Sequence, residues 1–137
     1  PVNIECSKKI GVSDDVAETT VSLGVSFHKD GSVIGSVFKI MFLVYLFDAN
    51  ISTLSILSTA LLATLLVTAV PIGGGTISEM LIITMLGYPL GTLPILTMIA
   101  TIIDPPATVL NVVGDSASAM LTSRFVDGKK WLNKKAS

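Results

Sequence analysis

Apolar residues in this chain are gathered into blocks, and short polar or glycine-rich breaks separate one block from the next. The four blocks run from Ser13 to Phe47 with an interruption, from Ile51 to Ala69, from Ile77 to Leu86 and from Leu93 to Leu121. A helix of a soluble domain keeps one polar face toward water, so its apolar residues form a stripe. Blocks that are apolar on every side instead predict an all-helical protein embedded in a membrane.

The first block predicts a membrane helix that is broken in its middle. Asp15 and Glu18 fall in the first helical turn, where the macrodipole favours acidic groups. The polar run from His28 to Ser32 then separates two apolar halves, and Lys39 interrupts the second half with a long stem that can reach a polar neighbour. Each half is shorter than the ~20 residues of a membrane span, which favours one interrupted span. The alternative is two short helices joined by a loop at the membrane surface.

The second and third blocks predict a re-entrant helical hairpin. Asn50 or Ser52 can cap the helix over 51–69, which ends at the run Val70-Pro71-Ile72-Gly73-Gly74-Gly75-Thr76. The second arm over 77–86 would be about 15 Å long, too short to cross a ~30 Å hydrocarbon core. The alternative is an ordinary loop outside the bilayer. A nucleotide-binding loop is disfavoured, because the run lacks the Gly-Lys-Ser/Thr ending that holds phosphate.

The fourth block carries a polar stripe on one helical face, with spacings of four, three and four residues. The stripe consists of Asp104, Thr108, Asn111 and Asp115, and Ser118 and Thr122 extend it. Carboxylates in such a helix cost several kcal/mol in lipid, so they are expected to face a protein interior or a wet cavity. Small polar residues also hold membrane helices together, but two aspartates go beyond that use. The stripe therefore predicts a binding site, with a kink expected at Pro105 and Pro106.

Composition agrees with a membrane protein and excludes several functions. Only 14% of residues are charged and the mean hydropathy is +0.76, whereas roughly a quarter of an average soluble domain is charged. The net charge of −1, without a basic face, argues against a nucleic-acid partner. Cys6 is the single cysteine, which excludes an internal disulfide and a paired-cysteine zinc site. No histidine lies near Cys6 to activate it, so we expect no catalysis there.

The C-terminal end is basic. Its cations are Arg124, Lys129, Lys130, Lys134 and Lys135. By the positive-inside rule this end is expected in the cytoplasm, with Trp131 at the membrane interface. The chain starts at Pro1 without a signal-peptide pattern, so we expect a fragment of a longer multi-pass protein.

Three ordered motifs resemble the dicarboxylate and amino acid:cation symporters, the glutamate transporter family. The segment 21–31 resembles the seventh helix of that family, which an Asn-Met-Asp-Gly-Thr signature interrupts. The run 70–74 resembles the Val-Pro-Gly-rich tip of the second hairpin. Asp104 and Thr108, followed by Asn111-Val112-Val113-Gly114-Asp115, resemble the final helix, whose pattern ends in Asn-Val-Thr-Gly-Asp.

The resemblance implies a fold and a set of partners. Residues 1–125 would form the C-terminal half of an elevator-type transport domain, and 126–137 a basic cytoplasmic tail. The fold would comprise a broken transmembrane helix, a re-entrant helical hairpin and a kinked final transmembrane helix in the cell membrane. The N-terminal scaffold helices and the tip of the first hairpin would lie outside this chain, with Pro1-Val2 at the start of the returning arm of that hairpin. The complete protein is expected to be a homotrimer.

The resemblance also assigns roles to individual residues. It implies a small-molecule substrate bound by Asp104, Ala107, Thr108, Asn111, Val70, Pro71, Gly73 and Gly74. It implies cation coupling through His28, Lys29, Asp30, Ser32, Asn111, Asp115, Thr64, Leu65 and Val67. Sodium is a candidate ion at Asp30, Asn111 and Asp115, with Na⁺ or H⁺ as the coupling ion, and no other cofactor is expected.

Two departures from the family pattern change the expected activity. Ala107 stands where acidic-substrate members carry an arginine that pairs with the side-chain carboxylate. A neutral amino acid is therefore favoured, although Lys39 can supply a charge from elsewhere. His28 and Lys29 replace Asn and Met, so a Lys29 ammonium beside Asp30 can take the place of sodium, or protonation can drive the cycle. The alternative is that Lys29 points to an interface and His28 only donates a hydrogen bond.

We therefore predict a secondary active transporter with altered or reduced sodium coupling. Two other classes stay open at this point. An intramembrane aspartyl protease would use Asp30 and Asp115 as a carboxylate pair, but the residues around both depart from the Gly-x-Gly-Asp and Tyr-Asp patterns of such enzymes. A truncated membrane protein without transport activity is the other alternative.

Overall fold

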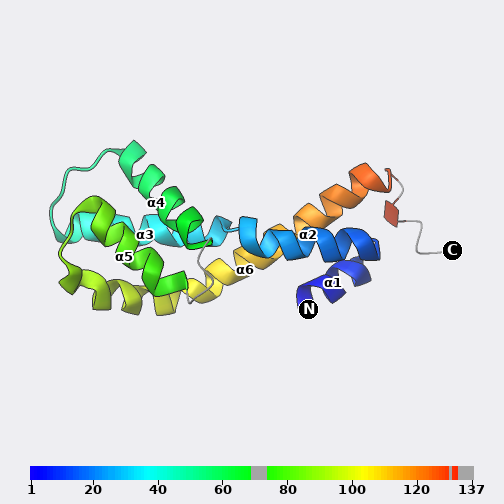
Figure 1. Ribbon diagram of the computed structural model, residues 1–137, viewed down its shortest axis with the longest axis horizontal. Coiled ribbons are helices and arrows are strands. Elements are labelled where there is room, and N and C mark those ends of the chain that lie inside the picture. The colour runs from blue at the N-terminus through cyan, green and yellow to red at the C-terminus, as the bar shows by residue number, and fades with distance from the viewer. Residues whose placement is uncertain (69–73, 130, 133–137) are drawn as a thin grey trace. The chain divides into compact units, whose positions relative to one another are not determined.

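The computed structural model describes residues 1–68, 74–129 and 131–132, and within these ranges all regular structure is helical (Figure 1). The elements are α1 (Val2–Ile10), α2 (Asp14–Phe27), α3 (Asp30–Leu46), α4 (Thr53–Thr68), α5 (Gly74–Leu86), the 3₁₀ turn η1 (Leu90–Thr92) and α6 (Leu93–Val126). The all-helical prediction is therefore confirmed for the part of the chain that the structure describes.

The chain divides into two compact units. Unit 1 consists of Pro1–His28 and Val109–Ser137, and unit 2 consists of Lys29–Thr108. Helix α6 contributes its second half to unit 1 and its first half to unit 2. The expected boundary between a transport domain over 1–125 and a basic cytoplasmic tail over 126–137 does not coincide with this division. That boundary stays a prediction.

Unit 1 is built from α1, α2 and the second half of α6. Its core contains Val12, Val16, Ala17, Val21, Ala119 and Trp131. The Trp131 side chain is 8% exposed, so it packs in this core, and its place at the membrane interface stays a prediction. The apolar blocks did not indicate helix α1, where the resemblance implies the returning arm of a hairpin, although α1 has Glu5 in its first turn, lysines in its last turn and Gly11 with a φ of 120° after its end. These are common helix-terminus signals.

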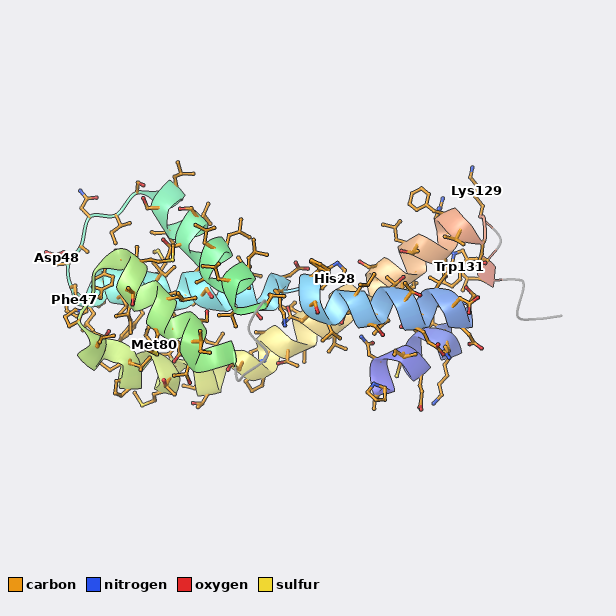
Figure 2. All side chains as sticks on the ribbon, in the orientation of Figure 1. His28, Phe47, Asp48, Met80, Lys129 and Trp131 are labelled. Atoms are coloured by element: carbon orange, nitrogen blue, oxygen red, sulfur yellow. The ribbon has the colours of Figure 1, made fainter. Side chains whose placement is uncertain are left out.

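Unit 2 packs α3, α4, α5, η1 and the first half of α6 around a second apolar core. The core contains Ile40, Leu43, Ile56, Ala60, Ala63, Ile82, Ile83 and Leu96. Ser52 caps α4, since its hydroxyl accepts the amide of Ser55 at 3.2 Å, which confirms the predicted cap. Phe47, labelled in Figure 2, follows the end of α3. Its ring stacks on Tyr88 with centroids 5.0 Å apart.

Large apolar side chains also project outward from unit 2. Those exposed on α4 are Leu54, Leu57, Leu61, Leu62, Leu65 and Leu66. A row of exposed leucines of this extent is typical of a helix that faces lipid or another protein segment.

The break between α2 and α3 is narrower than the sequence indicated. Five residues over 28–32 were expected to be non-helical, but α3 already begins at Asp30. Gly31 serves close packing instead of flexibility, because a Cβ on it would overlap the carbonyl of Ala107. Only His28 and Lys29 interrupt the helices.

Two other boundaries differ from expectation. Helix α5 begins at Gly74 rather than Ile77, and α6 continues to Val126 with Pro105 and Pro106 inside it. Each proline removes one amide donor, which a long helix tolerates when its other bonds persist. The kink at these prolines stays a prediction.

One helical stretch in the described ranges, Leu90–Val126, is long and apolar enough to cross a membrane by length and composition. Thr53–Thr68 and Gly75–Leu86 are apolar but shorter. Both fall below the ~20 residues of a span.

Candidate functional site

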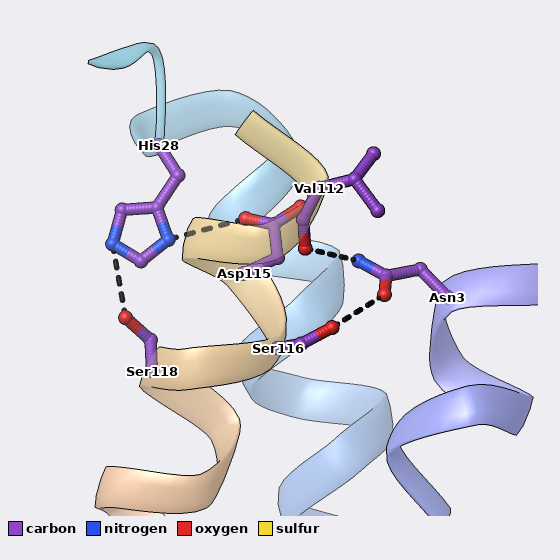
Figure 3. Close-up of polar contacts among 6 residues, drawn as sticks. All are labelled: Asn3, His28, Val112, Asp115, Ser116 and Ser118. Carbon is purple, nitrogen blue, oxygen red and sulfur yellow. Dashed lines mark hydrogen bonds and ion pairs between the residues drawn. The ribbon is translucent and has the colours of Figure 1, made fainter. Parts of the chain in front are cut away.

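Asp115 lies at the centre of a polar cluster in unit 1 (Figure 3). The Nδ1 atom of His28 is 3.2 Å from Asp115 Oδ1, and Ser118 Oγ is 3.1 Å from His28 Nε2. The Asp115 side chain is 5% exposed and that of His28 is 30% exposed. A protonated imidazole would donate one hydrogen bond to Asp115 Oδ1 and one to Ser118 Oγ. A neutral imidazole that donates to Asp115 would instead accept a hydrogen bond from the Ser118 hydroxyl. The cluster therefore links a buried carboxylate, a partly exposed imidazole and a serine hydroxyl.

Helix α2 brings His28 to this position. His28 follows the last residue of α2, and its amide donates to Gly24 O at 2.7 Å. A cation at a helix C-terminus is favoured by the macrodipole. Gly24 lies directly against the Asp115 side chain, and a Cβ on it would overlap Oδ1. The missing side chain of Gly24 thus allows α2 and α6 to approach closely enough for the His28 contact, a role that sequence reasoning missed.

Helix α1 supports the same turn of α6. Asn3 Nδ2 donates to the carbonyl of Val112 at 3.3 Å, and Ser116 Oγ donates to Asn3 Oδ1 at 2.8 Å (Figure 3). Val112 and Ser116 are one helical turn apart, so the side-chain amide of Asn3 bridges the turn of α6 that contains Asp115. Neither Asn3 nor Ser116 was a candidate from the sequence. The Asn3 contacts join positions more than a hundred residues apart, which no local pattern reveals.

Asn111 and the other residues of the predicted stripe are divided between the two units. Asn111 is half-buried and belongs to unit 1 with His28 and Asp115. Asp104 and Thr108 belong to unit 2, where both are exposed and the Thr108 hydroxyl donates to Asp104 O at 2.8 Å. The structure therefore brings His28, Asp115 and Ser118 together, and the complete substrate site stays a prediction.

The remaining cation candidates lie in unit 2. Asp30 is exposed, while Lys29 and Ser32 are half-buried. No ion pair joins Lys29 to Asp30 in the described part of the chain, and the replacement of sodium by the Lys29 ammonium stays a prediction. It is His28 that pairs with a carboxylate.

The second-hairpin candidates are only partly described. Thr64 is buried and its hydroxyl donates to Ala60 O at 2.8 Å, while Leu65 is exposed and Val67 is half-buried. Gly74 begins α5. The other candidates here, Val70, Pro71 and Gly73, lie outside the described residues.

Unit 2 contains a buried ion pair that sequence reasoning missed. Lys39 Nζ donates to Glu79 Oε1 at 3.0 Å, and Thr97 Oγ1 donates to Glu79 Oε2 at 2.7 Å. The side chains of Lys39 and Glu79 are 7% and 1% exposed. The ammonium is therefore neutralised inside the α3, α5 and α6 packing. The sequence contained a signal for this pair, because Lys39 and Glu79 are opposite charges in two separate apolar blocks. Charges inside a membrane are rarely left unpaired.

Ala107 is also enclosed. It is 8% exposed, and the backbone of Gly31 lies against its carbonyl. The alanine side chain supplies no cation at this position.

Comparison with known proteins agrees with the motifs. A family model described as the sodium:dicarboxylate symporter family matches residues 1–125. The L-cystine uptake protein TcyP of Shouchella clausii is 28% identical over 131 residues, which cover 90% of this chain and 28% of that protein. The putative sodium-dependent excitatory amino acid transporter glt-6 of Caenorhabditis elegans is 23% identical over 133 residues, or 94% of this chain and 24% of that protein.

The chain thus spans about a quarter of the length of these curated relatives. No solved structure gave a significant match.

Proposed function

Because this chain belongs to the sodium:dicarboxylate symporter family, we propose that it supplies part of the substrate and cation sites of a secondary active transporter for a small amino acid or carboxylate. The family consists of membrane transporters and not of enzymes, so the aspartyl protease alternative is withdrawn. The proposed protein lies in the cell membrane with its C-terminus in the cytoplasm, and forms a homotrimer when complete.

The helix lengths support the proposed membrane topology. Helices α2 and α3 have 14 and 17 residues and are separated by only two, which fits one interrupted span. Helices α4 and α5 have 16 and 13 residues, which suits two re-entrant arms better than two spans. Helix α6, with 34 residues, is the final transmembrane helix of the proposal.

We favour a substrate without net charge. Asp104 would pair with the substrate ammonium, and Thr108 and Asn111 would contact its polar groups. An acidic side chain would need a further cation, but Ala107 provides none and Lys39 is already paired with Glu79. A buried carboxylate without a partner is strongly disfavoured. L-cystine, named for the TcyP relatives, carries two ammonium and two carboxylate groups and so fits this expectation.

The contact between His28 and Asp115 carries the proposal for altered coupling. In a sodium-coupled site a carboxylate gains an exchangeable cation from solution. Here the imidazole, tethered 3.2 Å from Asp115 Oδ1, can supply the positive charge itself, and only its proton is exchangeable. We therefore expect weak dependence on sodium and a contribution from protons.

Uptake into proteoliposomes by the full-length protein tests both parts. Labelled L-cystine, L-serine and L-aspartate would be supplied with a sodium gradient or with choline. We expect cystine or serine uptake at least about tenfold above aspartate uptake, equivalent to ~1.4 kcal/mol, and little loss of uptake in choline. A preference for aspartate would overturn the substrate assignment.

The variant His28→Asn tests the coupling residue, with Lys29→Met as its matched control. We expect His28→Asn either to become sodium-dependent or to lose uptake, because Asp115 then lacks its tethered cation. Lys29→Met should keep the ion dependence of the wild type. Wild-type uptake that requires sodium, with the same ion stoichiometry in His28→Asn, would refute the coupling proposal.

A further inference from the structure

Three helices of unit 2 meet at one carboxylate. Glu79 of α5 accepts hydrogen bonds from Lys39 of α3 and from Thr97 of α6, one on each oxygen. Among residues 75–79, Glu79 is the first buried side chain of α5. An apolar anchor would fit many positions on a surface of Ile, Leu and Ala, whereas a buried carboxylate is satisfied only where its two donors lie. The α5 helix is thus held in one register.

The ion pair continues a tightly packed contact between α3 and α6. Gly31, Gly35 and Lys39 follow one another at four-residue spacing on one face of α3. A Cβ on Gly31 would overlap the Ala107 carbonyl, and one on Gly35 would lie 3.0 Å from Ile103 Cγ2. As residue numbers rise along α3 from Gly31 to Lys39, the numbers of their neighbours on α6 fall from Ala107 toward Thr97, so the two helices are antiparallel here. The last step, from Lys39 to Thr97, passes through Glu79.

Small residues alone specify this contact weakly. Gly31 and Gly35 allow the backbones to approach, which favours association in a membrane, but they carry no side chain that resists sliding. A slip of one helical turn would move α3 by ~5.4 Å along α6. It would also separate Lys39 from Glu79 and leave two buried charges unpaired, a strong penalty.

We propose that Lys39, Glu79 and Thr97 form a register lock, a set of positioning residues that fixes α3 and α5 against the first half of α6. Asp30 directly precedes Gly31, and Asp104 directly follows Ile103, so the lock sets the separation of these two carboxylates along the helices. The inference rests on the proposed function, in which Asp30 and Asp104 serve cation and substrate. The lock residues themselves do not touch substrate.

The direct test of register is cysteine crosslinking in the full-length protein with Cys6→Ser. Gly35→Cys is combined with Ile103→Cys, its observed neighbour, or with Ile99→Cys, one turn away. Disulfides require Cβ atoms ~3.5–4.5 Å apart, so the locked protein should form only the 35–103 bond. With Lys39→Met and Glu79→Met added, the 35–99 bond should appear at a comparable rate. Unchanged crosslinking in that background would overturn the lock.

Transport kinetics test its consequence. The Lys39→Met, Glu79→Met double variant removes both charges of the pair and so leaves neither without its partner. We therefore expect a thermal unfolding midpoint near that of the wild type. Its KM for cystine or serine should rise about tenfold. Exchange of the two charges, Lys39→Glu with Glu79→Lys, should restore most of the affinity. Thr84→Val, which removes an exposed hydroxyl that donates to the Met80 carbonyl of α5, is the matched control with unchanged KM.

The outcomes separate the two proposals. A double variant with wild-type stability, crosslinking and KM would show that the pair only fills space. If the double variant fails to fold, Thr97→Val, which removes one hydrogen bond, must still raise KM by several fold, and an unchanged KM would reject the lock. If the wild type moves no amino acid, the transport proposal fails, while the crosslinking result still decides the lock.

Discussion

The substitution Gly24→Ala tests whether α2 and α6 depend on their close approach at Asp115. In isolation this change should stabilise a helix by ~0.5–1 kcal/mol, because glycine is a poor helix former. In the structure the added Cβ would overlap Asp115 Oδ1. Asp115 must then turn away from His28, or the two helices must separate.

The expected magnitude follows from these opposing effects. Overpacking a buried contact typically costs ~1–3 kcal/mol, and loss of a hydrogen bond to a charged group costs ~1.5–3 kcal/mol. The helix propensity recovers at most ~1 kcal/mol of this. We therefore expect Gly24→Ala to lower the free energy of unfolding by about 2–5 kcal/mol, and to abolish the effect of a further His28→Asn substitution.

Equilibrium unfolding of the full-length protein in mixed micelles, followed by circular dichroism, measures this change. Gly75→Ala is the matched control, because Gly75 is also helical but has no atom within 4 Å of the position that an added methyl group would take. It should stabilise the protein by ~0.5–1 kcal/mol. A Gly24→Ala variant that is as stable as the wild type, or more stable, would refute the packing argument.

Two further predictions concern α1. Asn3→Ala removes two hydrogen bonds that hold α1 to α6, so the free energy of unfolding should fall by ~1–3 kcal/mol. The control Cys6→Ser, at an exposed position of the same helix, should leave it unchanged. Equal stability of the two variants would show that Asn3 does not stabilise the contact between α1 and α6. A hydrogen bond to Glu18 at 2.6 Å raises the pKa of Lys8 above its ordinary 10.5. The Lys8–Glu18 interaction therefore stabilises the fold fully below pH 10.5, and this effect disappears as pH rises through the folded-state pKa of Lys8. Glu18→Gln should bring the pKa of Lys8, measured by NMR titration, closer to 10.5, and an unchanged pKa would show that Glu18 is not the cause.

The sequence predicted the helical class and most helix positions because apolar blocks and turn residues are local signals. The cap at Ser52 is an example, since a serine before an apolar run needs no distant partner. The width of the break after α2 was overestimated for the opposite reason. In the sequence Gly31 suggests a helix break, but it lies within α3, and the absence of its side chain allows the close approach of Ala107.

The candidate site shows the same limit. The spacing of Asp104 and Asp115 identified polar residues that an apolar helix must accommodate, but it could not identify their partners. His28 and Asp115 are separated by 87 positions, and Lys39 and Glu79 by 40. Such pairs depend on which helix faces meet, which is decided by packing of all helices together. Lys29 and Asp30, although adjacent in the chain, form no such pair in the described residues.

The two buried acid–base pairs differ in what they permit. Lys39 and Glu79 are 7% and 1% exposed, and a second donor, the Thr97 hydroxyl, binds the other carboxylate oxygen. Water has little access to either charge, and separation of the pair would be strongly unfavourable, which suits a fixed positioning role. His28 is 30% exposed and directly follows a helix end, where a proton can enter or leave without disrupting a helix. In the proposed transporter, coupling therefore belongs to the His28 pair, and Lys39 keeps the helices in place while that pair changes its charge.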